Sequence, residues 1–318
     1  MTNKSNSFRL FFLKLAAFFC IVFIADFIIG NSLKKFYFKQ QTGYDYLTTY
    51  AIEKTKAEFL IFGSSRAVSI FNCDIFEDQI DFSCYNVGRD GEPIFYHYGI
   101  LKAVLKRYTP KIIILSFDAG NFSKKADDYD KLSVLLPYYE SHPEIRPIVE
   151  LKGRYEKLKL LSKIYSYNSL LLPIVAGNIA FNQKKYYNSN GYIPIYKFFS
   201  GPLQTFDYTN EGELDSVKVN TYKHFIQDCI KSNIQLYIVC PPYMINQIGI
   251  PPSITTAKKI AREYNIDFFD YSKDEFYTTK PQLFADYRHL NPQGVTIFSN
   301  AIIEKINYKT QLLKENKY

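Results

Sequence analysis

An apolar segment near the amino terminus limits what this chain can be more than any other feature. Residues 10–29 read LFFLKLAAFFCIVFIADFII, and only Lys14 and Asp26 among these 20 residues are charged. As a helix, the segment would be about 30 Å long, which matches the hydrocarbon thickness of a bilayer. Its apolar residues cover every side, which disfavours a buried helix of a water-soluble domain. We therefore expect a single membrane anchor over residues 10–30.

A cleaved signal peptide is the main alternative for this segment. It would have a shorter apolar region and a cleavage site of small residues, and residues 26–30 offer no A-x-A pattern. Three basic residues lie toward its amino-terminal side and three follow it, so the positive-inside rule does not decide the orientation. We expect residues 1–9 to form a short cytoplasmic tail.

The net charge of +8 is concentrated at the ends of the chain. Residues 1–40 carry six basic residues against Asp26 alone, and residues 303–318 carry a further net +2. The body of the protein is therefore almost neutral and lacks the basic face that binds phosphate backbones. Nucleic acid is excluded as an expected partner.

Five short apolar runs predict buried strands: AEFLIF (57–62), DFSCYNV (81–87), KIIILSF (111–117), IQLYIV (234–239) and IDFFDY (266–271). The third run is continuous and β-branched, which is typical of strands that a parallel sheet buries on both faces. Helical periodicity between the runs predicts helices over 93–108, 217–231, 253–264 and 291–306. Because alternating strands and helices are joined by crossovers, we expect an α/β core with a mostly parallel, five-stranded sheet.

Residues 123–215 interrupt this alternation, and we expect them to form a large, mainly helical insertion into a core of 57–122 and 216–306. The apolar piece SLLLPIVAGNIAF (169–181) is too short to span a bilayer. We expect it to pack within the insertion, and contact with the membrane surface is the alternative. Residues 31–56 are expected to be a juxtamembrane stalk and residues 307–318 a tail.

Four histidines are candidates for a proton shuttle: His97, His142, His224 and His289. The first and third lie in helical patterns typical of structural histidines, and we expect His142, in a polar loop, to be solvated. His289 differs because it follows Asp286 by three residues in DYRHLNPQG (286–294). At this spacing a carboxylate can orient the imidazole and stabilise its protonated form, which leaves the second ring nitrogen free to accept a proton.

A nucleophile and two hydrogen-bond donors are predicted at the carboxyl edge of the sheet. Ser65 directly follows the first predicted strand, where open α/β sheets keep their sites, although a turn with capping serines is the alternative. Its hydroxyl needs a base from far along the chain. Gly91 follows the second strand and offers a backbone N–H, and Asn121 follows the third and offers a side-chain amide. Donors of this kind stabilise an oxyanion.

In this order, a serine, a glycine, an asparagine and an Asp–His pair resemble the four blocks of the SGNH/GDSL hydrolase superfamily. IFGSSR (61–66) is similar to the nucleophile block, in the GSS form of membrane-anchored, cell-envelope members. NVGRDG (86–91) is similar to the second block and DYRHLNPQG to the last. The third block departs, because SFDAGN (116–121) replaces the usual G-x-N-D. Asn121 aligns only with a shift of one residue, and Asp118 is a candidate for a local structural task.

The resemblance implies a flavodoxin-like, three-layer fold in which Ser65 is the nucleophile, His289 the base and Asp286 its orienter. It also implies that Ser65, Gly91 and Asn121 stabilise the oxyanion. The implied activity is that of an esterase or O-acyltransferase working through an acyl-enzyme on acyl (acetyl) esters of cell-envelope polysaccharide. The resemblance places this domain outside the cytoplasm on a single-pass cell-membrane protein, with a membrane acyltransferase as a possible partner.

Other interpretations remain open at this level. The chain could be a catalytically inactive member of the same fold that binds glycan or assembles an acyltransferase complex. Nucleotide binding is disfavoured because residues 63–65 lack the glycine spacing and lysine of phosphate-binding loops.

The five cysteines are scattered without metal-ligand or C-x-x-C spacing, and we expect neither a metal nor a cofactor. Arg66 could contact an anionic substrate or be an exposed structural residue. The aromatic loop YYNSNGYIPIY (186–196) could stack on sugar rings or pack on the surface.

Overall fold

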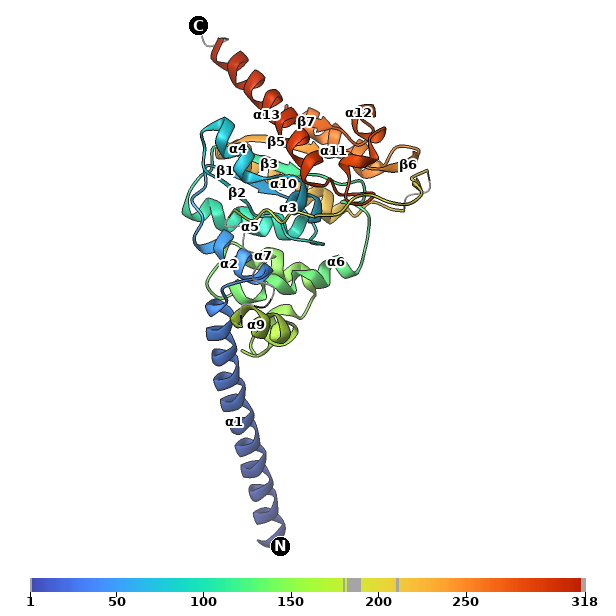
Figure 1. Cartoon of the computed structure of the whole chain (residues 1–318). Coiled ribbons are helices and arrows are strands. Elements are labelled where there is room, and N and C mark those ends of the chain that lie inside the picture. The colour runs from blue at the N-terminus through green and yellow to red at the C-terminus, as the bar shows by residue number, and fades with distance from the viewer. Residues whose placement is uncertain (1, 180, 182–189, 210–211, 316–318) are drawn as a thin grey trace.

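A parallel sheet of five strands forms the centre of the computed structural model, which describes residues 2–179, 181, 190–209 and 212–315 (Figure 1). Its spatial order is β2 (Cys84–Asn86), β1 (Phe59–Phe62), β3 (Ile112–Ser116), β5 (Gln235–Cys240) and β7 (Asp267–Asp270). Every pair of neighbours is parallel. All five predicted strands are confirmed, and their order is that of flavodoxin-like folds.

Helices cover both faces of this sheet, which gives three layers. The first face carries α5 (Ile94–Arg107), α10 (Ser216–Lys231) and α11 (Pro252–Glu263). The opposite face carries α3 (Ser65–Ile70), α4 (Cys73–Ile80) and α13 (Pro292–Glu315). Strand residues alternate between the layers: Leu60 and Phe62 are buried in the first core, and Phe59 and Ile61 in the second. Burial on both faces is the reason why the strands read as continuous apolar runs.

The last helix begins where the sequence predicts and ends later. The Asn291 side-chain oxygen accepts a hydrogen bond from the Gly294 N–H at 3.1 Å, as expected of an N-cap, and α13 starts at the next residue. The helix continues beyond Ile306 to Glu315, so the expected tail is helical over that stretch, and residues 316–318 lie outside the described part. Two short helices, α12 (Glu275–Thr278) and η5 (Pro281–Leu283), connect β7 to α13.

The regular structure of the insertion between β3 and α10 is mainly helical, as expected. Its helices are α6 (Asp127–Asp130), η1 (Lys131–Tyr138), α7 (Arg146–Val149), η2 (Glu150–Lys152), α8 (Glu156–Lys159), η3 (Tyr165–Leu170) and α9 (Leu171–Asn178). The segment also contains β4 (Gln204–Asp207), which pairs in parallel with β6 (Ile245–Ile248). This second, two-stranded sheet was not predicted.

The amino-terminal helix α1 (Thr2–Lys39) projects from the domain (Figure 1). Among the described residues it is the one helix that is long and apolar enough to cross a membrane, and the rest of the chain buries none of its most apolar part. The prediction of a stalk over residues 31–56 is wrong. Here α1 continues to Lys39, and α2 (Tyr44–Glu53) packs against α5. Tyr37, Ala51 and Ile52 are buried in the first core, so their apolar surface makes this segment part of the domain.

Candidate active site

The turn after β1 presents Ser65 at the carboxyl edge of the sheet. Gly63 and Ser64 connect β1 to α3, whose first residue is Ser65. Gly63 has a φ of +141°, and a Cβ there would lie 2.8 Å from the Ser116 Cβ and 2.9 Å from the Ala67 Cβ. Only glycine allows the turn to approach β3 so closely. As the first residue of the helix, Ser65 also has a backbone N–H without an acceptor inside the helix.

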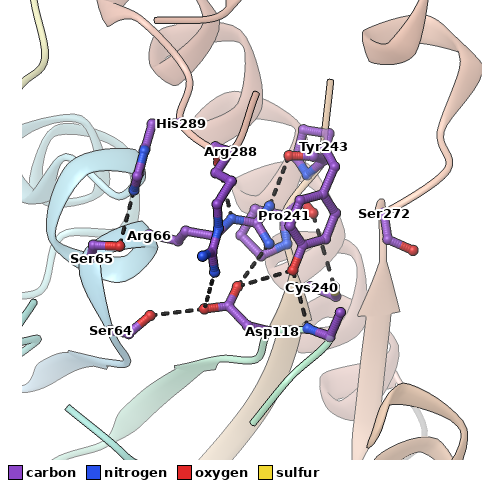
Figure 2. Close-up of polar contacts among 12 residues, drawn as sticks. Ser64, Ser65, Arg66, Asp118, Cys240, Pro241, Tyr243, Ser272, Arg288 and His289 are labelled. Carbon is purple, nitrogen blue, oxygen red and sulfur yellow. Dashed lines mark hydrogen bonds and ion pairs between the residues drawn. The ribbon is translucent and has the colours of Figure 1, made fainter. Parts of the chain in front are cut away.

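The Ser65 hydroxyl meets the imidazole of His289, 224 residues later in the chain (Figure 2). Ser65 Oγ lies 3.0 Å from His289 Nε2. The other ring nitrogen, Nδ1, lies 2.9 Å from Asp286 Oδ2 and 3.0 Å from Oδ1. Ser-His-Asp triads show the same order of contacts. The structure therefore brings together the three side chains that the sequence singled out.

A tight loop holds the carboxylate in place beneath the imidazole. Asp286 Oδ1 accepts hydrogen bonds from the backbone N–H groups of Arg288 at 2.8 Å and His289 at 2.9 Å. The Ala285 N–H donates to the His289 carbonyl at 2.8 Å, which closes the loop. Although partial burial opposes ionisation, the hydrogen bonds from His289 and the backbone lower the pKa of Asp286 to about 2. The residue is thus a carboxylate over the whole physiological pH range.

A buried ion pair between Arg66 and Asp118 lies beneath this site. Arg66 therefore neither faces a substrate nor is exposed, which were the two expectations for it. Its side chain is fully buried and contacts neither solvent nor the cavity at Ser65. The guanidinium donates from Nη1 to Asp118 Oδ1 at 2.7 Å, from Nη2 to the Pro242 carbonyl at 2.8 Å and from Nε to the Arg288 carbonyl at 3.1 Å (Figure 2). Its Cζ also lies 3.7 Å from the ring centre of Tyr243. Arg66 therefore joins the ends of β3 and β5 to the loop that carries His289.

Asp118 has the structural task that the altered third block suggests. Its carboxylate accepts from Arg66, from the Ser64 hydroxyl at 2.8 Å and from the Tyr243 hydroxyl at 3.3 Å. Burial opposes ionisation of this group, but the Arg66 and Arg288 charges and the Ser64 hydrogen bond hold the pKa of Asp118 below its usual value. We call this set of contacts around Arg66 and Asp118 the arginine clamp. Its two halves are distant in sequence, and no local motif predicts their pairing.

A polar cavity of about 270 Å³ opens at Ser65. Gly91 and Asn121 line it, so all three residues predicted to stabilise an oxyanion face the same space. Gly91 has a φ of +72° and no atom within 4 Å of the position a Cβ would take, so its backbone is accessible from the cavity. The roles of these groups as donors stay a prediction.

Glu92 is a buried carboxylate in the wall of the same cavity. Its side chain is 7% exposed, and its Oε1 lies 3.6 Å from Arg89 Nε. The other oxygen, Oε2, has no hydrogen-bond partner in the described part of the chain. Burial outweighs the attraction of Arg89 and Lys131 and raises the pKa of Glu92 to about 7.

A second cavity, of about 240 Å³, adjoins the first, with which it shares Gly120, Lys125 and Arg288. Phe206 of β4 lies between two other rings in its wall. Its ring centre is 5.5 Å from that of Tyr287 and 6.4 Å from that of Tyr208, with interplanar angles of 24° and 18°. We call these three rings the aromatic wall. Tyr287 belongs to the loop that carries Asp286 and His289, so the wall begins next to His289.

The sequence pointed to different aromatic residues. In the loop 186–196, residues 186–189 lie outside the described part; Tyr192 is buried in the second core, and Tyr196 is exposed but does not line either cavity. The aromatic wall was missed because β4 and β6 are too short and polar to read as strands. His142 is also not solvated as expected, since Glu53 and Glu144 bracket its ring at 2.8 and 2.7 Å.

Comparisons with known proteins leave the function open. No protein-family model and no curated protein matches the chain. Among solved structures it is similar to the crystal structure of an acetyl xylan esterase, AlAXEase, with 14% sequence identity and a TM-score of 0.41. The similarity covers 78% of this chain and 99% of that one. A likeness this distant identifies no activity, and the reaction must be inferred from the geometry.

Removing the acid from the arginine clamp should destabilise the fold strongly. Asp118→Asn leaves the buried Arg66 guanidinium without its counter-charge, and we expect the free energy of unfolding to fall by about 3 kcal/mol or more. The matched control is Glu213→Gln, which disrupts an ion pair with Lys124 whose side chains are 76% and 64% exposed. The control should change stability by less than about 0.5 kcal/mol. Urea denaturation measures both, and equal effects would contradict the assigned role of the clamp.

Stability should depend on pH through Glu92. Its pKa is about 7 in the folded chain against 4.5 for a free glutamate side chain, so folding penalises its ionised form. The penalty is absent below pH 4.5, grows as the pH rises and is complete above pH 7. Glu92→Gln should therefore match the wild type near pH 4 and be more stable at pH 8, by on the order of 3 kcal/mol. Thermal unfolding at both pH values tests this; a difference that does not change with pH would contradict it.

Proposed function

We propose that this protein is a membrane-anchored serine esterase or O-acyltransferase of the SGNH type. The single observation that carries the proposal is the continuous contact from Ser65 Oγ to His289 to Asp286 at the carboxyl edge of the sheet. A serine hydroxyl is a weak nucleophile until a base accepts its proton. Here the base is within hydrogen-bond distance and is itself oriented by a carboxylate that is ionised at neutral pH.

The proposed reaction proceeds through an acyl-enzyme. Ser65 Oγ attacks the carbonyl carbon of an ester, while its proton passes to His289 Nε2 and Asp286 stabilises the imidazolium. The negative charge on the carbonyl oxygen is met by the Ser65 and Gly91 N–H groups and the Asn121 amide. The ester bond then breaks, and His289 returns the proton to the departing alcohol. Water or a second hydroxyl repeats the sequence in reverse and releases Ser65, which gives hydrolysis or transfer.

The aromatic wall supports a carbohydrate as the carrier of the ester. Flat aromatic faces pack well against the apolar faces of sugar rings, and the shared cavity residues connect the wall to the Ser65 pocket. The polar lining at Ser65 suits a small acyl group such as acetyl on a hydroxyl-rich chain. With α1 as the anchor, the substrate we propose is an acylated polysaccharide of the cell envelope, and the domain lies on the extracytoplasmic side.

A catalytically inactive, glycan-binding or assembly subunit of an acyltransferase complex is the competing function. The departure of the third block, SFDAGN, favours it, because Asn121 is displaced by one residue from the family pattern. The accessible cavity at Ser65, with Asn121 in its wall, favours the enzyme.

Removing the nucleophile or the base should abolish turnover. On 4-nitrophenyl acetate we expect Ser65→Ala and His289→Ala each to lower kcat at least about 1,000-fold, with the far-UV circular dichroism unchanged. Ser64→Ala is the matched control, because this neighbouring hydroxyl lines the same cavity but bonds to Asp118. It should lose no more than about tenfold. Wild-type turnover by Ser65→Ala would refute the esterase, and a folded wild-type chain without turnover would favour the inactive subunit.

Truncating the aromatic wall should weaken binding of long substrates only. Tyr208→Ala removes the ring of the aromatic wall that is farthest from the loop carrying His289. We expect KM for an acetylated oligosaccharide to rise about fivefold to tenfold. KM for 4-nitrophenyl acetate should stay the same, because that ester occupies only the Ser65 cavity. Tyr208→Phe keeps the ring and should behave as the wild type. Equal changes for both substrates would argue against a sugar subsite in this cavity.

A further inference from the structure

Exposed apolar side chains gather where α1 joins the domain. Outside α1, the described residues include sixteen large apolar side chains that are exposed, and eight of them lie within residues 155–181. We call these eight the apolar collar: Tyr155, Leu158, Leu161, Leu171, Leu172, Val175, Ile179 and Phe181. Such a concentration within one short segment is uncommon in a water-soluble domain and indicates an interaction site.

The collar is attached directly to α1. In Figure 1, α9 lies beside α1 at the end of the domain from which α1 projects, and α1 packs against both α9 and η3. Asp26 of α1 accepts hydrogen bonds from the Ser162 hydroxyl at 2.5 Å and from the N–H groups of Lys163 at 2.7 Å and Ile164 at 3.2 Å. Leu161 immediately precedes this contact. These contacts fix the height of the Leu161 end of the collar at Asp26. The α9 end lies further along α1, where the Asn178 side chain donates to the Phe36 carbonyl at 2.9 Å.

The height of Asp26 along α1 corresponds to the surface of a bilayer. Contacts of α1 with the domain begin at Asp26, and the 19 residues from Ser7 to Ala25 rise about 28 Å, close to the thickness of the hydrocarbon core. If these residues cross the membrane, Asp26 and its partners lie in the headgroup layer. The adjoining end of the collar then faces lipid, and each leucine side chain that leaves water there stabilises this position of the domain.

The charge of the same segment fits anionic headgroups. Residues 150–163 contain five basic residues, Lys152, Arg154, Lys157, Lys159 and Lys163, against Glu150 and Glu156. The four lysines also pair with acids of the domain (Asp130, Glu150, Glu156 and Glu140), so the segment is moderately basic. Lys157 and Lys159 are on α8, the same short helix as Leu158. A basic segment interleaved with apolar residues is typical of surfaces that bind at the membrane interface.

We propose that the apolar collar inserts into the interfacial layer of the membrane around α1, so that the domain rests on the bilayer. This rests on the membrane anchoring given above as part of the proposed function. With the collar inserted, α1 and the domain form one body, and the candidate active site stays at a constant distance from the membrane. The occupant of the apolar surface is thus lipid.

The absence of tryptophan from the sequence allows a direct experiment with the full chain. Three variants each introduce one tryptophan at an exposed apolar position: Leu172→Trp in the collar (82% exposed), Phe23→Trp in α1 (73%) and Ile250→Trp beyond β6, away from α1 (68%). Each is reconstituted into phosphatidylcholine–phosphatidylglycerol vesicles with and without bromine on the acyl chains. Bromine quenches only tryptophans that contact lipid, and circular dichroism verifies the fold.

We expect bromolipid to quench Phe23→Trp and Leu172→Trp, both with blue-shifted emission, and to leave Ile250→Trp unquenched. Quenching of Phe23→Trp without quenching of Leu172→Trp would overturn the collar proposal and leave the anchor intact. In that case a blue-shifted Leu172→Trp would mean that protein, such as a second copy of the chain, covers the surface. An unquenched Phe23→Trp would overturn the anchor and the collar together, while the esterase assays would remain independent of this result.

Discussion

The arginine clamp is the interaction on which the candidate site depends. A guanidinium that is buried away from water needs a counter-charge and hydrogen-bond acceptors from the protein, because an unpaired buried charge costs several kcal/mol. Arg66 meets this requirement with a carboxylate just beyond β3, a carbonyl beyond β5 and a carbonyl of the loop that carries His289. These partners come from three separate stretches of the chain. Since Arg66 directly follows Ser65, the same requirement positions Ser65 relative to His289.

The clamp also gives the acidic residue of the segment SFDAGN (116–121) a structural role. In the segment SFDAGN, the acidic residue Asp118 points inward to Arg66, Ser64 and Tyr243. Asn121, three residues later, remains in the cavity wall. The loop after β3 thus divides two tasks between two residues: one holds the turn that carries Ser65, and the other faces the cavity. The insertion that follows contributes to both further features: β4 supplies Phe206 of the aromatic wall, and α8 and α9 carry four of the eight residues of the apolar collar.

The sheet and the convergence of Ser65, Asp286 and His289 could be predicted from the sequence. Other features could not, and the difference has a physical reason. Strands such as 111–117 are apolar on both faces, a signal contained in consecutive residues. Ser65 and the Asp286–His289 pair follow strands or precede a capped helix, so sheet topology alone brings them to one edge. The clamp, the β4–β6 pairing and the packing of residues 31–56 depend on contacts between distant segments. For Arg66, a polar residue beside a nucleophile suggested exposure, and its burial follows only from partners that no local pattern reveals.

The most direct measurement of the central claim, that Ser65 is an activated nucleophile, is active-site labelling followed by peptide mass spectrometry. Folded, full-length protein is incubated with a fluorophosphonate, whose phosphorus a serine alkoxide attacks with loss of fluoride. We predict one adduct, on Ser65, whose formation slows strongly in His289→Ala because the proton acceptor is gone. An unmodified Ser65 in the folded wild-type chain, or an adduct on a different hydroxyl, would contradict the account.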